Sequence, residues 1–216
     1  MKQKYLKVDP LYYELFQRAL SKGDLRKIQI LEEAIRQLTS QGIENVSLES
    51  ISKRIGLKRA HVAHYFPSIG TIVDAAVRLI TMKAQRITVE GISSVSTSLE
   101  IVRTVVDGAF RWADQYPDHA RLMALFYYYA TWNKKYRALH TKIRIVGAER
   151  LSVAIKSHRP QLSKKSVEQF ATHIQCLITG YLLHALTVEM EEPINDFRKR
   201  LNRHIEKLLN ESTSID

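Results

Sequence analysis

Residues 47–66 read SLESISKRIGLKRAHVAHYF, and no other stretch of the chain is as specific. The hydroxyl of Ser47 can accept hydrogen bonds from the free backbone N–H groups of a helix that begins just after it. Gly56 ends that helix, because glycine adopts the left-handed turn conformation without a Cβ clash. A second short helix with basic side chains follows, and Val62 faces back to the core. Two short helices joined by a glycine turn predict a helix-turn-helix.

A third helix is predicted upstream, over Lys27–Gly42. Four apolar side chains share one of its faces, and we expect this face to pack across the helix pair. They are Ile30, Leu31, Ala34 and Leu38.

The order of residues over 24–80 resembles the N-terminal domain of the tetracycline-repressor (TetR) family of transcription regulators. The resemblance implies an all-α fold, with an N-terminal helix-turn-helix domain of three helices and a C-terminal helical domain for ligand binding and dimerisation. It divides the chain into an N-terminal extension with a short helix (1–23), the DNA-binding domain with its connecting helix (24–90) and the C-terminal domain (91–216). The matching residues are a basic residue, Ile-Leu, Ala, Leu and Gly upstream, then Ser47, Ile51, Gly56 and Tyr65-Phe66-Pro67-Ser68.

Three positions depart from the family's pattern. Ala63 stands where a tyrosine is usual, Lys58 where a serine or threonine opens the recognition helix, and Ile69 where a lysine begins the fourth helix. The usual residues mostly contact DNA phosphates. Either Lys58 and Arg59 replace these phosphate contacts, or the protein no longer binds DNA. The sequence leaves both alternatives open.

Composition sets broad limits. With 216 residues, 45% apolar and 25% charged, the chain can bury the core of an ordinary globular protein. Its one cysteine, Cys176, permits no internal disulfide, so we expect a reducing, cytoplasmic location. The first ten residues lack the apolar core of a signal peptide, and no segment reaches the about 18 apolar residues of a membrane span, so no membrane partner is expected.

The net charge of +11 suits a polyanionic partner but does not locate it. Residues 1–80 hold 13 Lys/Arg and 8 Asp/Glu, a net of +5, and residues 81–216 hold 20 and 14, a net of +6. Segment 134–165 is the densest in basic residues, with Glu149 as its single acidic one. A solvated helix face is the default interpretation of that segment, and a second nucleic-acid contact, an acidic partner or an anionic ligand are the alternatives.

The remaining chain predicts helices only. Their ranges are Leu11–Leu20, Thr71–Val89, Leu99–Tyr116, Asp118–Thr131 and Lys134–Ser157, followed by regular helices over about 167–185 and 194–208, with a loop at Gly91–Ser98. The N-terminal residues Lys2, Lys4 and Lys7 could reach a minor groove as an arm, although charged termini are usually just solvated.

The resemblance places DNA contacts on and around the second helix of the pair. Arginine or lysine can bridge guanine O6 and N7, and histidine can donate to a base or a phosphate. The alternative is a solvated helix face in a domain without DNA. His61 and His64 do not predict a metal site, because no further ligands stand at usable spacing. The candidate DNA-binding residues are Lys27, Ser47, Lys58, Arg59, His61, His64 and Tyr65.

By the same resemblance, the C-terminal domain holds a small-molecule cavity. Its aromatic and methionine residues predict a mainly apolar effector with a polar end near Tyr127 or His173, although such residues can equally be plain core. The candidate pocket residues are Met82, Phe110, Tyr116, Met123, Phe126, Tyr127 and His173.

The last two helices predict a dimer interface, and Gly180 would let a neighbouring helix approach closely. The alternative is that both helices simply close the monomer core. The candidate interface residues are Phe170, Ile174, Leu177, Tyr181, Phe197, Leu201 and Ile205.

The resemblance therefore implies a homodimeric regulator that binds double-stranded operator DNA, most simply a repressor released from a pseudo-palindromic operator by a small, mainly apolar effector. One alternative is a TetR-fold carrier of a lipid or apolar ligand that no longer binds DNA. The other is an enzyme, but no GxSxG, HExxH, CxxC, P-loop or dinucleotide motif occurs. We therefore expect no catalytic residue, no cofactor and no metal.

Overall fold

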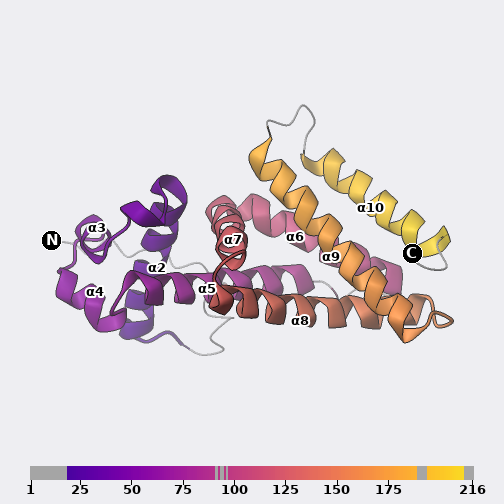
Figure 1. The fold of residues 1–216 in the computed structure, drawn as a ribbon, viewed down its shortest axis with the longest axis horizontal. Helices are drawn as coiled ribbons and strands as arrows, with labels where there is room; N and C mark the ends of the chain where they lie inside the picture. The colour runs from indigo at the N-terminus through magenta and orange to yellow at the C-terminus, as the bar shows by residue number, and fades with distance from the viewer. Residues whose placement is uncertain (1–18, 91, 93–94, 96, 189–193, 212–216) are drawn as a thin grey trace. The chain divides into compact units, whose positions relative to one another are not determined.

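The computed structural model describes residues 19–211 apart from 91, 93–94, 96 and 189–193. Over these residues the chain is all-α, with nine α-helices, one short 3-10 helix and no strand (Figure 1), which confirms the predicted fold class. The predicted arm at Lys2, Lys4 and Lys7 and the first eight residues of the predicted helix Leu11–Leu20 lie outside the described residues. The elements are α2 (Lys22–Gln41), η1 (Ile43–Asn45), α3 (Leu48–Arg54), α4 (Arg59–Tyr65), α5 (Ile69–Val89), α6 (Ser98–Gln115), α7 (Pro117–Ala130), α8 (Lys134–His158), α9 (Lys164–Thr187) and α10 (Ile194–Glu211).

The chain forms two compact units, Met1–Lys83 and Ala84–Asp216. The first contains α2, η1, α3, α4 and most of α5, and the second contains α6 to α10 with the end of α5. None of the helices in the described part is both long and apolar enough to cross a membrane.

Two serine caps fix the helix starts of the N-terminal unit. The Ser47 hydroxyl accepts the backbone N–H of Ser50 at 3.0 Å, so α3 begins where the sequence predicts. The start of α2 differs, because Ser21 and Asp24 form a reciprocal capping box that begins this helix at Lys22, five residues before the predicted Lys27.

The turn between α3 and α4 is set by Gly56, which has φ +68°. This left-handed conformation is the one predicted from the sequence, and it sends the chain directly from α3 into α4. The core beneath the two helices is apolar: Ile51 of α3 and Val62 of α4 are both buried, α3 packs against α2, and α4 packs against α3. The buried side chains of that face include Ile30, Leu31, Ala34 and Leu38, as expected.

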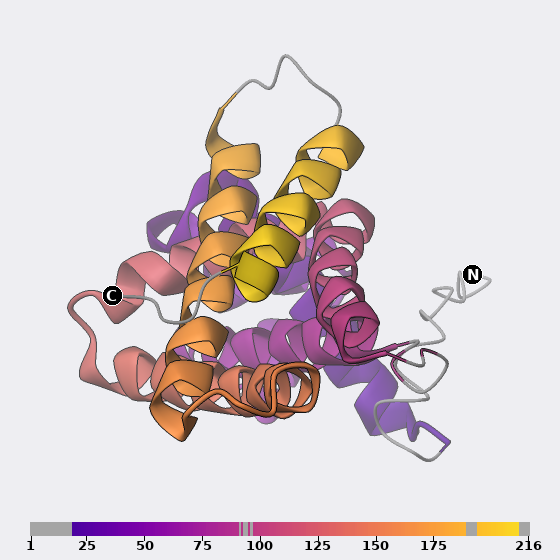
Figure 2. The same cartoon turned by 90° about the vertical axis from the view of Figure 1, so that its right-hand side faces the viewer.

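The C-terminal unit is a helical bundle whose core is shared by α6, α8, α9 and α10. Figure 2 shows α10 lying along α9 and α6. Gly108 permits a close approach of α6 to the end of α5, since a Cβ atom there would lie 2.5 Å from the Thr88 Cα. The helix α6 begins at a capping box between Thr97 and Glu100.

Candidate nucleic-acid interface

The short helix α4 has one buried anchor and an exposed basic surface. Val62 is 0% exposed, and Phe66, just beyond the helix, is also buried. Because these two apolar side chains face the core, Arg59, His61 and His64 are left on the exposed side. The helix therefore presents three nitrogen-bearing side chains within its seven residues.

These side chains are not used to stabilise the fold. Among the residues that the structure describes, Lys58, Arg59 and His61 have no hydrogen-bond or ion-pair partner in their side chains. Lys58 is the N-cap residue of α4 and makes no side-chain cap. Tyr65 is half-buried, and its ring contacts the ring of His64 edge-on at 5.2 Å between centroids. The structure thus brings these five predicted residues together around one helix.

The other two predicted DNA-binding residues lie elsewhere. Lys27 is exposed on α2. Ser47 is committed to its own helix, because its hydroxyl accepts the Ser50 N–H and its N–H donates to the Ser50 hydroxyl, each at 3.0 Å. A DNA contact by Ser47 has to coexist with this capping box.

A polar contact that the sequence patterns did not predict fixes α3 to α2. Gln37 is only 4% exposed, its side-chain oxygen accepts the Ser50 hydroxyl at 2.7 Å, and its amide donates to the Ser50 carbonyl at 3.3 Å. The same amide donates to Glu33 at 2.6 Å. A signal was present, since Gln37 lies three residues after Ala34 on the apolar face of α2.

A second missed residue lies on α5. Lys83 is 1% exposed, and its Nζ lies 3.2 Å from Glu32 of α2, which ties α5 to α2 within the N-terminal unit. Lys83 follows Ile80 by three residues and Ala76 by seven on the buried face of α5, so the sequence also marked it. A buried ammonium group requires such a partner.

The predicted pocket residues have mixed positions. Met82 is 40% exposed on the part of α5 that belongs to the N-terminal unit. In the C-terminal unit Tyr116 stacks on His119 at 5.0 Å, and His173 borders an open hollow of about 400 Å³ along α9. Buried in the packing of the same unit are Phe110, Met123 and Phe126.

Tyr127 has more specific surroundings. Its ring lies 4.8 Å from that of His140, which also contacts Phe126 at 5.9 Å. Burial raises the pKa of Tyr127, while a hydrogen bond with Thr179 and the charge of Arg144 oppose the rise. Burial lowers the pKa of His140, and Arg144 lowers it further. A polar group thus joins α7, α8 and α9.

The predicted dimer residues divide into two sets. Leu177 and Tyr181 are half-exposed, and Tyr181 contacts Phe197 at 4.6 Å between ring centroids. The other five side chains are buried in the core of their own unit, which fits the alternative that these helices close the monomer core. They are Phe170, Ile174, Phe197, Leu201 and Ile205. A partner could contact these helices only through their exposed faces.

Part of the basic segment 134–165 serves the fold. Arg137 donates to the Ala130 carbonyl at 3.0 Å, and Lys156 donates to the carbonyls of Pro160 and Leu162, each at 2.7 Å. Arg137 thereby satisfies a carbonyl at the end of α7, and Lys156 holds the turn between α8 and α9. Some of the basic residues in this segment are therefore used for contacts within the fold.

Comparison with known proteins agrees with this architecture. Residues 30–76, which run from α2 into α5, match the family model described as "Bacterial regulatory proteins, tetR family". Among curated protein sequences, none matches this chain.

Solved structures share the fold over most of the chain. A putative transcriptional regulator from Saccharomonospora viridis, in complex with choline, is 22% identical, with a TM-score of 0.75 over 84% of this chain and 96% of that one. A putative transcriptional regulator from Pseudomonas aeruginosa PAO1 is 13% identical, with a TM-score of 0.77 over 89% and 94%. A putative TetR-family regulator from Rhodococcus sp. is 15% identical, with a TM-score of 0.70 over 86% and 98%.

Proposed function

We propose that this chain, a TetR-family transcriptional regulator by its N-terminal domain, binds operator DNA through α4 and is released by a small effector bound in its C-terminal unit. The observation that carries the proposal is the set of unpaired side chains on α4. Lys58, Arg59 and His61 point away from the buried Val62 and have no role in the fold. Exposed cations on a rigid helix suit the major groove.

The departures from the family's pattern fit this use of α4. Ala63 is half-buried between the exposed His61 and His64 and offers no phosphate contact. Lys58, at the N-cap position, has a free ammonium group that can reach a phosphate. We therefore assign phosphate contact to Lys58 and base reading to Arg59 and His61.

A single seven-residue helix reads only a few base pairs, so the protein acts as a dimer. Two copies of α4 about 34 Å apart would read successive major grooves of a pseudo-palindromic operator. The exposed faces of α9 and α10 are the proposed contact, with Leu177 and Tyr181 at the boundary of core and surface. The effector shifts the population toward a state with a different spacing, and near-complete release needs a preference of about 5 kcal/mol for that state.

The test is DNA binding by the full chain, titrated against salt with DNA from its own promoter region. The variant is Arg59→Ala/His61→Ala, and the control is Lys142→Ala/Arg150→Ala, which removes two exposed cations from α8, outside the proposed DNA and dimer contacts. We expect the variant to lose specific affinity by at least about tenfold, since a base-reading contact contributes about 1–3 kcal/mol, and the control to bind like the wild type.

Weak binding, indifferent to sequence and equal in variant and control, would contradict the proposal. The DNA-free ligand carrier would then be favoured, with Ala63 and Ile69 as its supporting positions. A transcription regulator needs no catalytic activity. An enzymatic activity that substitution of Tyr127 or His140 abolishes would therefore count against the proposed function.

A further inference from the structure

Arg144 differs from the other half-buried arginines among the residues that the structure describes. Arg26 donates to Gln29 at 2.6 Å, Arg159 donates to the Leu209 carbonyl, and Arg198 lies 3.3 Å from Asp107. In contrast, the Arg144 guanidinium has one side-chain contact, 3.5 Å from Nη2 to the sulfur of Cys176. Within the described part of the chain no carboxylate or carbonyl pairs with Arg144.

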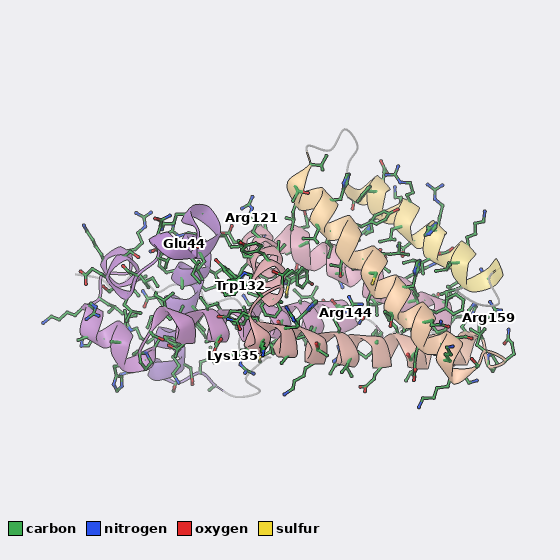
Figure 3. All side chains as sticks on the ribbon, viewed as in Figure 1. Glu44, Arg121, Trp132, Lys135, Arg144 and Arg159 are labelled. Carbon is green, nitrogen blue, oxygen red and sulfur yellow. The ribbon has the colours of Figure 1, made fainter. Side chains whose placement is uncertain are left out.

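This arginine lies in a polar group between helices. Figure 3 labels Arg144 where α9 passes α8, and Cys176 of α9 is the neighbour that its guanidinium contacts. His140 precedes Arg144 by one helical turn on α8, so both side chains share a face. From α7, Tyr127 places its ring 4.8 Å from that of His140, and its hydroxyl is paired with Thr179 of α9.

His140 also has unused polar atoms. Its ring contacts Phe126 and Tyr127 only through aromatic packing, and among the described residues its nitrogens have no hydrogen-bond partner. Burial and the neighbouring Arg144 both lower its pKa, so the ring is neutral near pH 7 and presents one N–H donor. A guanidinium and an imidazole donor thus share one helix face, and the Cys176 sulfur, a weak acceptor, is the one side-chain acceptor that the described residues offer to Arg144.

We infer that Arg144 and His140 form an anion site that takes the carboxylate of an acidic organic effector. A guanidinium matches a carboxylate in a bidentate geometry, and the imidazole N–H can donate to the same oxygen pair. The rings of Phe126 and Tyr136, in edge contact at 5.8 Å between centroids, adjoin His140 and give this group an apolar border. The site rests on the proposed function, because it names the chemical class of the effector.

The positive charge also excludes a class of ligand. A quaternary ammonium favours aromatic faces, of which this region has several. However, an unpaired guanidinium beside those rings would repel it, since like charges at such distances destabilise each other in a partly buried site. An acid is therefore the ligand that this arginine selects, in contrast to the choline found with the Saccharomonospora viridis regulator.

Three probes with alkyl tails of nine or ten carbons test the charge preference on the full chain: decanoate, decanol and decyltrimethylammonium. We expect saturable calorimetric binding of decanoate, with decanol about 10- to 100-fold weaker and the cation weakest, because a charge-assisted pair is lost in each case. Arg144→Gln should remove the preference for decanoate, and Arg144→Lys should keep part of it. The control Arg150→Gln removes an exposed cation of the same helix and should bind all three probes like the wild type.

The unliganded melting temperature of each variant serves as the folding control. Equal affinity for decanoate and decanol, no saturable decanoate binding, or an unchanged preference in Arg144→Gln would each overturn the anion site. DNA binding of the same preparation separates the two proposals. If DNA binds and decanoate does not, the anion site alone fails, and if decanoate binds selectively without DNA binding, the regulator fails while the anion site stands.

Discussion

The hydrogen bonds between Gln37 of α2 and Ser50 of α3 should contribute measurably to the free energy of unfolding of the N-terminal unit. The perturbation is Gln37→Ala, which removes two interhelical bonds, of 2.7 and 3.3 Å. Each such bond contributes about 0.5–1.5 kcal/mol, so we expect a loss of about 1–3 kcal/mol in the free energy of unfolding of the N-terminal unit. Ser50 is half-buried, so water can reach its freed groups only in part.

The matched control is Gln41→Ala, an exposed glutamine in the last turn of the same helix. The assay is urea unfolding of the full chain followed by amide hydrogen exchange, because two compact units need not unfold in one transition. Exchange should accelerate in α3 and α4 and stay unchanged in α8 and α9. A stability loss no larger than that of Gln41→Ala, or faster exchange spread evenly over both units, would refute the reasoning.

Three further outcomes follow from the structure. Gly56→Ala should cost about 1–2 kcal/mol in urea unfolding, because the residue has φ +68° and only the backbone conformation resists a Cβ atom there. Gly108→Ala should lower the melting temperature by overpacking worth about 1–3 kcal/mol, whereas Gly70→Ala, whose Cβ position meets only the Ser68 hydroxyl at 3.7 Å, should be neutral or stabilising, and the reverse order would contradict the described packing of α6. Because the folded protein lowers the pKa of His140, wild type should lose stability as pH falls below about 6.5 and on through the lowered folded pKa, and His140→Gln should lose less than the exposed control His204→Gln over that range.

Helix boundaries were predictable where a local signal fixes them. Ser47, Gly56 and Pro117 mark helix ends in both sequence and structure, because caps, left-handed turns and proline act through neighbouring backbone atoms. The predicted start of α2 was wrong by five residues, although Ser21 and Asp24 have the spacing of a capping box in the sequence. Apolar periodicity decided that prediction, and the first turn of α2 has too few apolar residues to extend it.

The last two helices show what periodicity cannot decide. The stripe containing Phe170 and Ile174 was expected to be buried, and it is, but inside its own unit rather than against a partner. A repeat of three and four residues reports that a face is covered and carries no information about which chain covers it. The exposed side of α4 was predictable for the opposite reason, since a seven-residue helix with one apolar anchor, Val62, has only one way to pack.

Polar residues on apolar helix faces indicated contacts between helices that apolar periodicity alone does not predict. Gln37 and Lys83 each stand three residues from a buried apolar side chain, and each is buried with a partner from another helix. Arg144 is half-buried on α8, two helical turns before the buried Leu151, and yet the described residues supply it with no anionic partner. A half-buried charge without a counterion is energetically costly. A charged residue on an apolar stripe that has no oppositely charged neighbour in the protein therefore indicates a bound ligand of opposite charge. The stripe of α8 thus points to an acid at Arg144 by the same rule that places Gln37 and Lys83 in the core of the N-terminal unit.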